Sequence, residues 1–238
     1  MDSPRAELLA SKGVVAESIQ WFGGPGQHHG PWEVPLELFI ERVAGLADVC
    51  ERVVVIGTSF GAEAALLTGA YSTDVAAVVA CAPTDVVWAG VRGDGSVTSH
   101  WTLDGLPLPY VPFDESWASD DDIPAFVGLY ESSRKRFPER LDAAAIPVER
   151  IGHLVLVAGG DDQVWPALPM AGSISARREA HGLSTVLVTD PEAGHRTVLP
   201  GEPVVGGGVR MRRGGTDTAD RRLGAAAWPH IEILLQRC

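Results

Sequence analysis

The sequence has little cysteine, almost no lysine and no long apolar run. Its three cysteines, Cys50, Cys81 and Cys238, are odd in number and irregularly spaced, which excludes a disulfide framework and a cysteine-type metal site. No apolar stretch reaches the roughly 18 residues that a membrane helix needs, and residues 1–5 have neither the basic nor the apolar part of a signal peptide. We therefore expect a soluble, cytoplasmic protein without a membrane partner.

The charge balance is strongly acidic. Asp and Glu number 31 against 19 Lys and Arg, so the formal net charge is −12, and lysine occurs only at Lys12 and Lys135. This balance argues against nucleic acid as a partner, although it leaves room for a local basic pocket. The 238 residues fit one domain with a substantial core, and no internal repeat divides them.

Helix-like and strand-like apolar segments alternate through most of the chain. Such alternation predicts an α/β fold, with a mainly parallel sheet covered by helices on both faces. The expected strands are residues 14–22, 52–56, 75–80, 154–158 and 185–188. The expected helices are a first one that Asp2 or Ser3 caps and Gly13 ends, then residues 35–49, 62–71, 167–181 and 218–236, the last bent at Pro229.

Residues 85–150 interrupt this alternation. They hold eight of the sixteen aromatic residues: Trp88, Trp101, Tyr110, Phe113, Trp117, Phe126, Tyr130 and Phe137. One interpretation is a satellite core beneath a long connection. The other is a cap excursion that walls an apolar acyl pocket. The two interpretations are compatible, and both keep residues 1–238 as a single domain.

A serine stands at the turn between a predicted strand and a predicted helix. The motif Gly-Thr-Ser-Phe-Gly begins at Gly57, after the β-branched run at residues 53–56 and before an Ala- and Leu-rich helix. This context is typical of a nucleophile elbow, in which glycines allow the sharp turn and the serine projects above the sheet edge. The motif predicts Ser59 as nucleophile, with the Phe60 N–H as one oxyanion donor. A Gly-rich turn of a nucleotide-binding unit is the alternative.

A serine hydroxyl needs a base within hydrogen-bond reach. Among seven histidines we predict His195, which follows the last expected strand at the edge where the elbow should open. His28 and His29 lie in a loop expected at the same edge, and an exposed loop pair is the favoured interpretation of them; without a nearby carboxylate or thiolate they are weak evidence for a metal. The remaining histidines are expected in the cap, at a strand start and at helix ends: His100, His153, His181 and His230.

The carboxylate that orients the base should also follow a strand. Asp162, just after residues 154–158, is the first choice, Asp161 the second and Asp85 the third. The order serine, acid, histidine matches that of α/β-hydrolases and not that of chymotrypsin-like or subtilisin-like enzymes. A cysteine nucleophile is disfavoured because no cysteine lies in an elbow.

The chain resembles the α/β-hydrolase domain shared by acyl-CoA thioesterases and bile-acid-CoA:amino-acid N-acyltransferases, and it is similar to dienelactone hydrolases. The resemblance runs almost end to end. It rests on RAELLASKG from Arg5, GTSFGAEAALL from Gly57, WTLDGLPLPY from Trp101, IPVERI from Ile146, GGDDQVWP from Gly159, the Ala-Gly-His of residues 193–195 and the segment from Gly214 that ends in AAAWP at Pro229. The cap and GGDDQVWP segments are the most specific.

The resemblance implies the roles of Ser59, Asp162 and His195 and an acyl thioester substrate. The serine would form an acyl-enzyme that water or an amine then accepts; in this family cysteine goes with transfer and serine with hydrolysis, so hydrolysis is expected. Carboxylester or lactone hydrolysis with the same triad and a non-catalytic relic are the alternatives. Trp165, Trp88 and Trp101 are expected to contact the substrate. Basic residues near 134–136 and 210–213 could meet CoA phosphates, although solvated surface charge is favoured. No metal or redox cofactor is implied.

The chain also departs from this family. It has no room for the N-terminal immunoglobulin-like domain of mammalian members, and it begins at the helix that in α/β-hydrolases follows a central strand and the loop with the second oxyanion donor. That strand would lie between residues 14–22 and 52–56; without it, two apolar edges would be exposed or would pair directly. Losing one oxyanion donor costs about 100- to 1,000-fold in turnover. The expectation is an N-terminally shortened hydrolase, or an intact start with the gap filled by a partner or by repacking.

Overall fold

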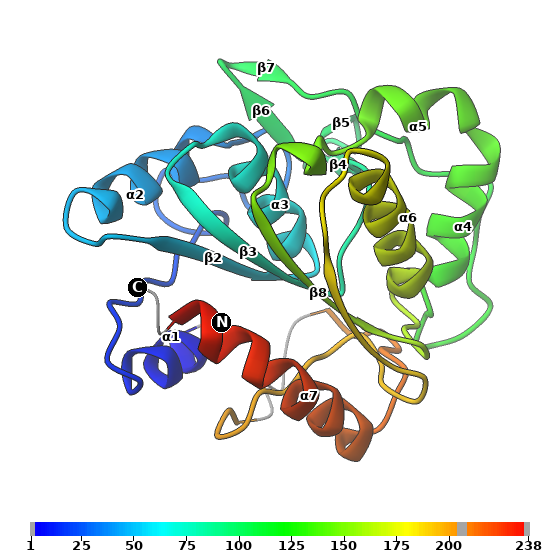
Figure 1. The fold of residues 1–238 in the computed structure, drawn as a ribbon. Coiled ribbons are helices and arrows are strands. Elements are labelled where there is room, and N and C mark those ends of the chain that lie inside the picture. Colours follow the sequence, from blue (N-terminus) through cyan, green and yellow to red (C-terminus); the bar gives the residue numbers. More distant parts are fainter. Residues whose placement is uncertain (1–2, 204–208, 236–238) are drawn as a thin grey trace.

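A four-stranded parallel sheet forms the centre of the fold. We describe it from a computed structural model, which describes residues 3–203 and 209–235. The strand order is β2-β3-β8-β9, and every neighbouring pair is parallel. The strands are β2 (Val53–Thr58), β3 (Val75–Cys81), β8 (His153–Gly159) and β9 (Val186–Asp190), seen side by side in Figure 1. They confirm four of the five predicted strands.

Helices cover both faces of this sheet, as predicted. The helices α2 (Glu37–Ala47), α3 (Phe60–Tyr71) and α6 (Ala167–Ala180) lie on one face, while α1 (Ser3–Ala10) and α7 (Asp217–Leu235) lie on the other (Figure 1). Pro229 lies inside α7, and the predicted helix end at residue 236 and cap at Asp2 fall outside the described residues. Within the described part of the chain, no helix is long and apolar enough to cross a membrane.

Successive side chains of the central strands point alternately into two apolar clusters, one on each face of the sheet. In β3, Val78 faces the cluster under α3 and α6, whereas Val79 faces the one under α7; in β8, Leu156 and Val157 divide in the same way. All four side chains are buried. Side chains of successive strand residues point to opposite faces, so a strand that is covered on both sides becomes a continuous apolar run. This burial explains why β3 and β8 were predictable from sequence.

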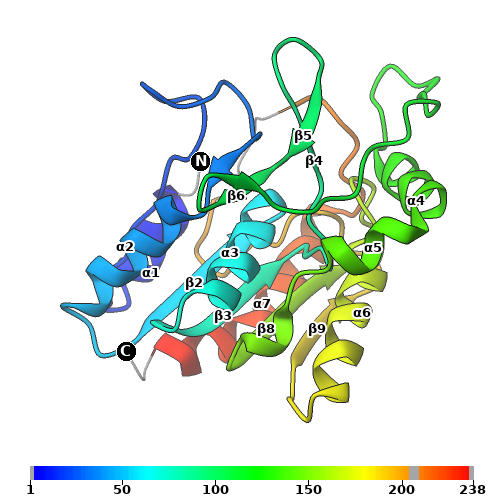
Figure 2. The same ribbon diagram turned by 90° about the horizontal axis from the view of Figure 1, so that it is seen from above.

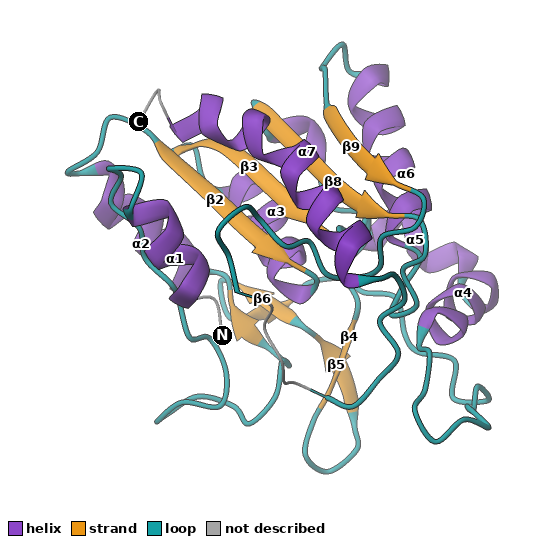
Figure 3. Cartoon of the chain, turned by 90° about the horizontal axis from the view of Figure 1, so that it is seen from below, coloured by secondary structure: helices purple, strands orange, loops and turns teal. Residues whose placement is uncertain are grey.

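The segment between β3 and β8 forms the excursion expected at residues 85–150. It contains β4 (Ala89–Val91), β5 (Val97–Ser99), β6 (Trp101–Leu103), β7 (Leu106–Pro107), α4 (Val127–Arg136), α5 (Pro138–Ala144) and the short helix η1 (Val148–Arg150). The first two strands form a hairpin, and β6 joins β7 and β1 (Val34–Pro35) in a second small sheet. Figures 2 and 3 show these strands gathered near the carboxyl ends of the central strands.

The aromatic residues of the excursion do not form a core of their own. Trp88, Trp101 and Tyr130 belong to the same buried cluster as the α3 face of the sheet. The Trp88 ring lies 4.7 Å from the Tyr130 ring and 6.1 Å, stacked, from that of Phe113. The excursion therefore packs into the main core, with the Tyr130 ring 5.4 Å from the ring of Trp165, which follows β8. Of the two interpretations, the satellite core is contradicted by this shared cluster.

The strand predicted at residues 14–22 does not form. Residues 15–21 belong to no helix or strand, and Val15 is 67% exposed. In the described part of the chain β2 pairs only with β3, so the two apolar edges do not pair directly either. Apolar period alone could not decide this point, because a strand persists only where its backbone groups find partners.

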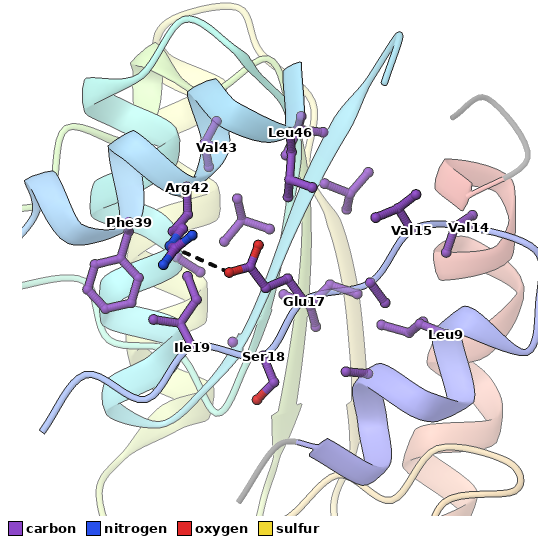
Figure 4. Close-up of a pocket in the computed structure, with 18 of the residues that line it drawn as sticks. Leu9, Val14, Val15, Glu17, Ser18, Ile19, Phe39, Arg42, Val43 and Leu46 are labelled. Atoms are coloured by element: carbon purple, nitrogen blue, oxygen red, sulfur yellow. Dashed lines mark ion pairs between the residues drawn. The ribbon is translucent and has the colours of Figure 1, made fainter. Parts of the chain in front are cut away.

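A groove of about 560 Å³ lies between β2 and residues 14–19. Side chains of β2, α2 and residues 14–19, most of them apolar, line much of it, as Figure 4 shows. Glu17 and Arg42 form an ion pair across it at 3.5 Å. Both of these side chains are well exposed, so the pair contributes little to stability.

Candidate active site

Ser59 sits at a strained turn between β2 and α3. The strand ends at Thr58 and the helix begins at Phe60, while Ser59 itself has φ 61° and ψ −125°. Glycine is favoured at such dihedrals, so a serine there stores strain of about 1–3 kcal/mol. A hydrogen bond of 3.0 Å from the Ser59 N–H to the Cys81 carbonyl holds the turn against the end of β3. A Cβ at Gly57 would overlap the Gly61 carbonyl, so the first glycine of the motif is required by close backbone approach.

Asp162 and His195 form a buried pair. The Nδ1 of His195 lies 2.8 Å from Oδ2 of Asp162, and the two residues are 7% and 8% exposed. The other carboxylate oxygen accepts the backbone N–H groups of Val164 at 2.9 Å and Trp165 at 3.3 Å. A carboxylate partner selects the imidazole tautomer with its proton on Nδ1, so Nε2 is the nitrogen that can take a proton.

The loops that carry this pair are in backbone contact. The Asp161 N–H donates to the Ala193 carbonyl at 2.9 Å, and a Cβ at Gly159 would overlap that same carbonyl oxygen. Glycine at the last position of β8 is therefore what lets the Asp161–Asp162 loop approach the histidine loop. Glycine at this position, the first of the GGDDQVWP segment, thus has a packing explanation.

A second carboxylate supports the histidine loop from α7. The Gly194 N–H donates to Oδ1 of Asp220 at 2.8 Å, and the His195 N–H donates to the Arg213 carbonyl at 2.9 Å. Burial raises the pKa of the Asp220 carboxyl above its usual range. The backbone on both sides of the Cα of Gly194 is thus fixed before the histidine side chain begins.

The serine, the acid and the histidine all follow carboxyl ends of parallel strands. Ser59 follows β2, Asp162 follows β8 and His195 follows β9, so all three lie at one edge of the sheet. Aromatic rings connect them: the Trp165 ring lies 5.5 Å from that of Phe60 and 5.6 Å from that of His195. Trp165 therefore packs between the residue after the serine and the base candidate.

Arg5 connects α1 to the same edge. Its guanidinium donates to Thr58 Oγ1 at 2.8 Å, to the Thr197 carbonyl at 3.0 Å and to both carboxylate oxygens of Glu202, at 2.9 and 3.0 Å. Thr58 precedes the serine and Thr197 follows the histidine by two residues. One arginine therefore fixes the first helix to both β2 and the histidine loop.

The second- and third-choice carboxylates are engaged elsewhere. Asp161 accepts the Gly215 N–H at 2.8 Å, and Asp85 forms a two-pronged ion pair with Arg134 at 2.7 and 2.9 Å. Among the described residues neither of them hydrogen-bonds to a histidine, whereas Asp162 does.

The other predicted site residues divide by exposure. His28 and His29 are exposed, and the His28 ring packs on Trp32 at 5.2 Å. The three tryptophans expected at the substrate are fully buried, so a direct substrate contact would require the packing around them to open: Trp88, Trp101 and Trp165. Among the described residues, no three His, Cys, Asp or Glu side chains are grouped as metal ligands.

Sequence reasoning missed a second carboxylate and histidine beside the serine. Glu63 and His100 are almost completely buried, and their side chains lie 3.3 Å apart. A signal was present, because Glu63 is an acidic residue in the otherwise apolar run GAEAALL. Its partner is 37 positions away in the excursion, so only the fold shows the pairing.

The groove of Figure 4 is distinct from this arrangement. The groove is lined in part by Thr58 and Gly61, which flank Ser59 and Phe60 in the sequence. Asp162 and His195 are not part of this lining. The groove therefore lies beside the serine turn, along the edge of β2 that does not pair with β3.

The parallel sheet, the strained serine turn and the carboxylate–histidine pair together define an α/β-hydrolase-like protein. The sequence model of the family described as BAAT / Acyl-CoA thioester hydrolase C terminal matches residues 35–215, and the chain belongs to this family. The resemblance seen in the sequence is thereby confirmed, and the family implies activity of the acyl-CoA thioester hydrolase or acyltransferase type. A search of curated proteins gave no match.

Proposed function

We propose that the protein is a serine hydrolase of acyl thioesters, with Ser59 as nucleophile, His195 as base and Asp162 as orienting acid. The observation that carries this proposal is the 2.8 Å bond between His195 and Asp162 at the sheet edge where the strained serine turn opens. The family supplies the substrate class, because a triad alone does not choose the leaving group.

In the first half of the reaction, Ser59 Oγ attacks the thioester carbonyl while its proton passes to Nε2 of His195. Asp162 stabilises the imidazolium that forms. The Phe60 N–H belongs to the first turn of α3, where no carbonyl precedes it in the helix, so it can donate to the developing oxyanion. The carbon–sulfur bond then breaks, and the thiol leaves with the proton from His195.

In the second half, water attacks the acyl-enzyme. His195 takes one water proton, the new carbon–oxygen bond forms, and the carboxylic acid leaves as Ser59 regains its proton. An amine in place of water would give an amide by the same steps. The serine nucleophile, in place of the cysteine that accompanies transfer in the resembled family, favours water. The excursion at residues 85–150 would cap the site and exclude bulk solvent.

Turnover of acyl-CoA and of p-nitrophenyl esters by the purified chain tests this proposal. The variant Ser59→Ala removes the nucleophile, and Ser173→Ala, at an exposed serine of α6, is its matched control. A fluorophosphonate probe reports the activated serine independently of substrate. We expect release of free CoA and labelling in the wild type and in Ser173→Ala, and neither in Ser59→Ala.

Other outcomes would select another function. Ester cleavage without thioester cleavage would reject the thioesterase proposal in favour of a carboxylesterase or lactone hydrolase. Amide formation that outpaces hydrolysis when glycine or taurine is added would indicate an acyltransferase. A folded wild type that neither labels nor turns over any of these substrates would reject catalysis and favour a binding or scaffolding role.

A further inference from the structure

The structure contains a second carboxylate–histidine pair close to Ser59. Glu63, in the first turn of α3, has no exposed surface, and His100, between β5 and β6, is 2% exposed. Nδ1 of His100 lies 3.3 Å from Oε2 of Glu63, and the Trp88 N–H donates to Oε1 at 3.0 Å. A buried carboxylate is costly unless its oxygens are hydrogen-bonded, so these two donors are what make Glu63 tolerable inside the protein.

This pair is connected directly to the serine turn. The Glu63 N–H donates to the Ser59 carbonyl at 3.1 Å. Glu63 also follows Phe60 by three residues, so their side chains share one face of α3. On that face the His100 ring meets the Phe60 ring edge-on, with 4.1 Å between centroids. His100 therefore contacts both the buried carboxylate and the residue whose N–H would donate to the oxyanion.

We propose that His100 is a positioning residue for the reaction, holding Glu63 and Phe60 so that the start of α3 can stabilise the oxyanion. The inference rests on the proposed serine hydrolase function. In the tautomer with its proton on Nδ1, His100 donates to Oε2 and draws the carboxylate charge away from the helix start. Without that donor, negative charge at Oε2 would oppose the negative charge that develops on the substrate, at low local dielectric.

Two substitutions of His100 separate its hydrogen bond from its ring. His100→Phe keeps an aromatic ring against Phe60 but removes the donor, whereas His100→Asn keeps a donor near the position of Nδ1 and removes the ring. We expect His100→Phe to lower kcat about tenfold with KM within about twofold, and His100→Asn to stay within about threefold of the wild type. Equal losses in both variants would overturn the role of the hydrogen bond.

A substitution of Glu63 tests whether the effect on kcat is electrostatic. Glu63→Gln removes the charge but keeps a carbonyl oxygen for the Trp88 N–H. Added to His100→Phe, it should restore kcat to within about threefold of the wild type, because no uncompensated charge remains. Failure to restore kcat would overturn the proposal and leave the pair as an anchor of the excursion.

Ser99→Ala is the structural control. The Ser99 hydroxyl is buried in the same turn and accepts the Trp101 N–H at 3.2 Å, without contact to the carboxylate. It should lower the melting temperature and leave kcat unchanged. A loss of kcat that simply follows melting temperature across all variants would overturn the inference. If the wild type is active and His100→Phe has the same kcat, this inference alone is overturned. If the wild type is inactive, the proposed function is overturned as well.

Discussion

Replacing Asp162 by asparagine changes one atom of the proposed triad and should abolish most of the activity. The amide oxygen can still accept the N–H groups of Val164 and Trp165, which bond to Oδ1 at 2.9 and 3.3 Å. The amide NH₂ then faces His195 and can only donate, so the histidine must place its proton on Nε2, toward the serine. A catalytic histidine in this tautomer cannot accept the serine proton, and the expected cost in kcat is about four orders of magnitude.

The fold should survive this change. Three acceptor contacts become two acceptor contacts and one donor contact, so we expect a loss of about 1–2 kcal/mol in the free energy of unfolding. Asp161→Asn is the matched control, because Asp161 adjoins the same turn but bonds to Gly215 and Gln163. Its effect on kcat should be less than about threefold.

Thioester turnover, followed by the free thiol released, measures the catalytic effect, and thermal unfolding measures stability. The expected result is an Asp162→Asn variant that is folded, nearly inactive and labelled slowly by the fluorophosphonate probe. If this variant kept a tenth or more of wild-type kcat, or if Asp161→Asn were the more damaging change, Asp162 could not be the orienting acid.

Three further predictions concern the framework. Gly57→Ala should prevent formation of the serine turn, because its Cβ would overlap the Gly61 carbonyl; a soluble variant that still labels with the probe would contradict this. Arg222 lowers the pKa of Asp190 by hydrogen bonding, so this pair should stabilise the fold above pH of about 4 and lose its effect as pH falls below that value. The melting temperature of the Arg222→Gln variant should therefore depend less on pH in that acidic range than the melting temperature of the wild type. Arg178→Met should cost about 3 kcal/mol or more in urea unfolding, because the buried guanidinium donates to four backbone carbonyls.

The parts of the fold that followed from sequence are those whose evidence is local. The switch from a β-branched run to an apolar helix at Ser59 predicted both the turn and its neighbours, because glycine freedom and side-chain period act over a few residues. The carboxylate after β8 and the histidine after β9 also followed, since strands of a parallel sheet end at one edge. The sequence already placed Asp162 ahead of Asp161, and in the structure it is Asp162 that hydrogen-bonds to His195.

The parts that did not follow depend on contacts between distant segments. Residues 14–22 have the apolar composition of a strand, but in the described structure they pair with no strand, and the groove separates them from the free edge of β2. Glu63 was visible as an acidic residue in an apolar helix, yet His100 reaches it only through the excursion. Similarly, the tryptophans were predicted as substrate contacts from composition, which could not show their complete burial.

At Ser59 the backbone conformation favours glycine, whereas the proposed reaction needs a serine hydroxyl. Glycine would adopt φ 61° without the penalty that any side chain incurs there, and it would lack the hydroxyl. Random substitution under selection for stability alone would therefore tend to remove the serine. A position at which glycine would relieve backbone strain is therefore the position that the proposed reaction requires to be serine.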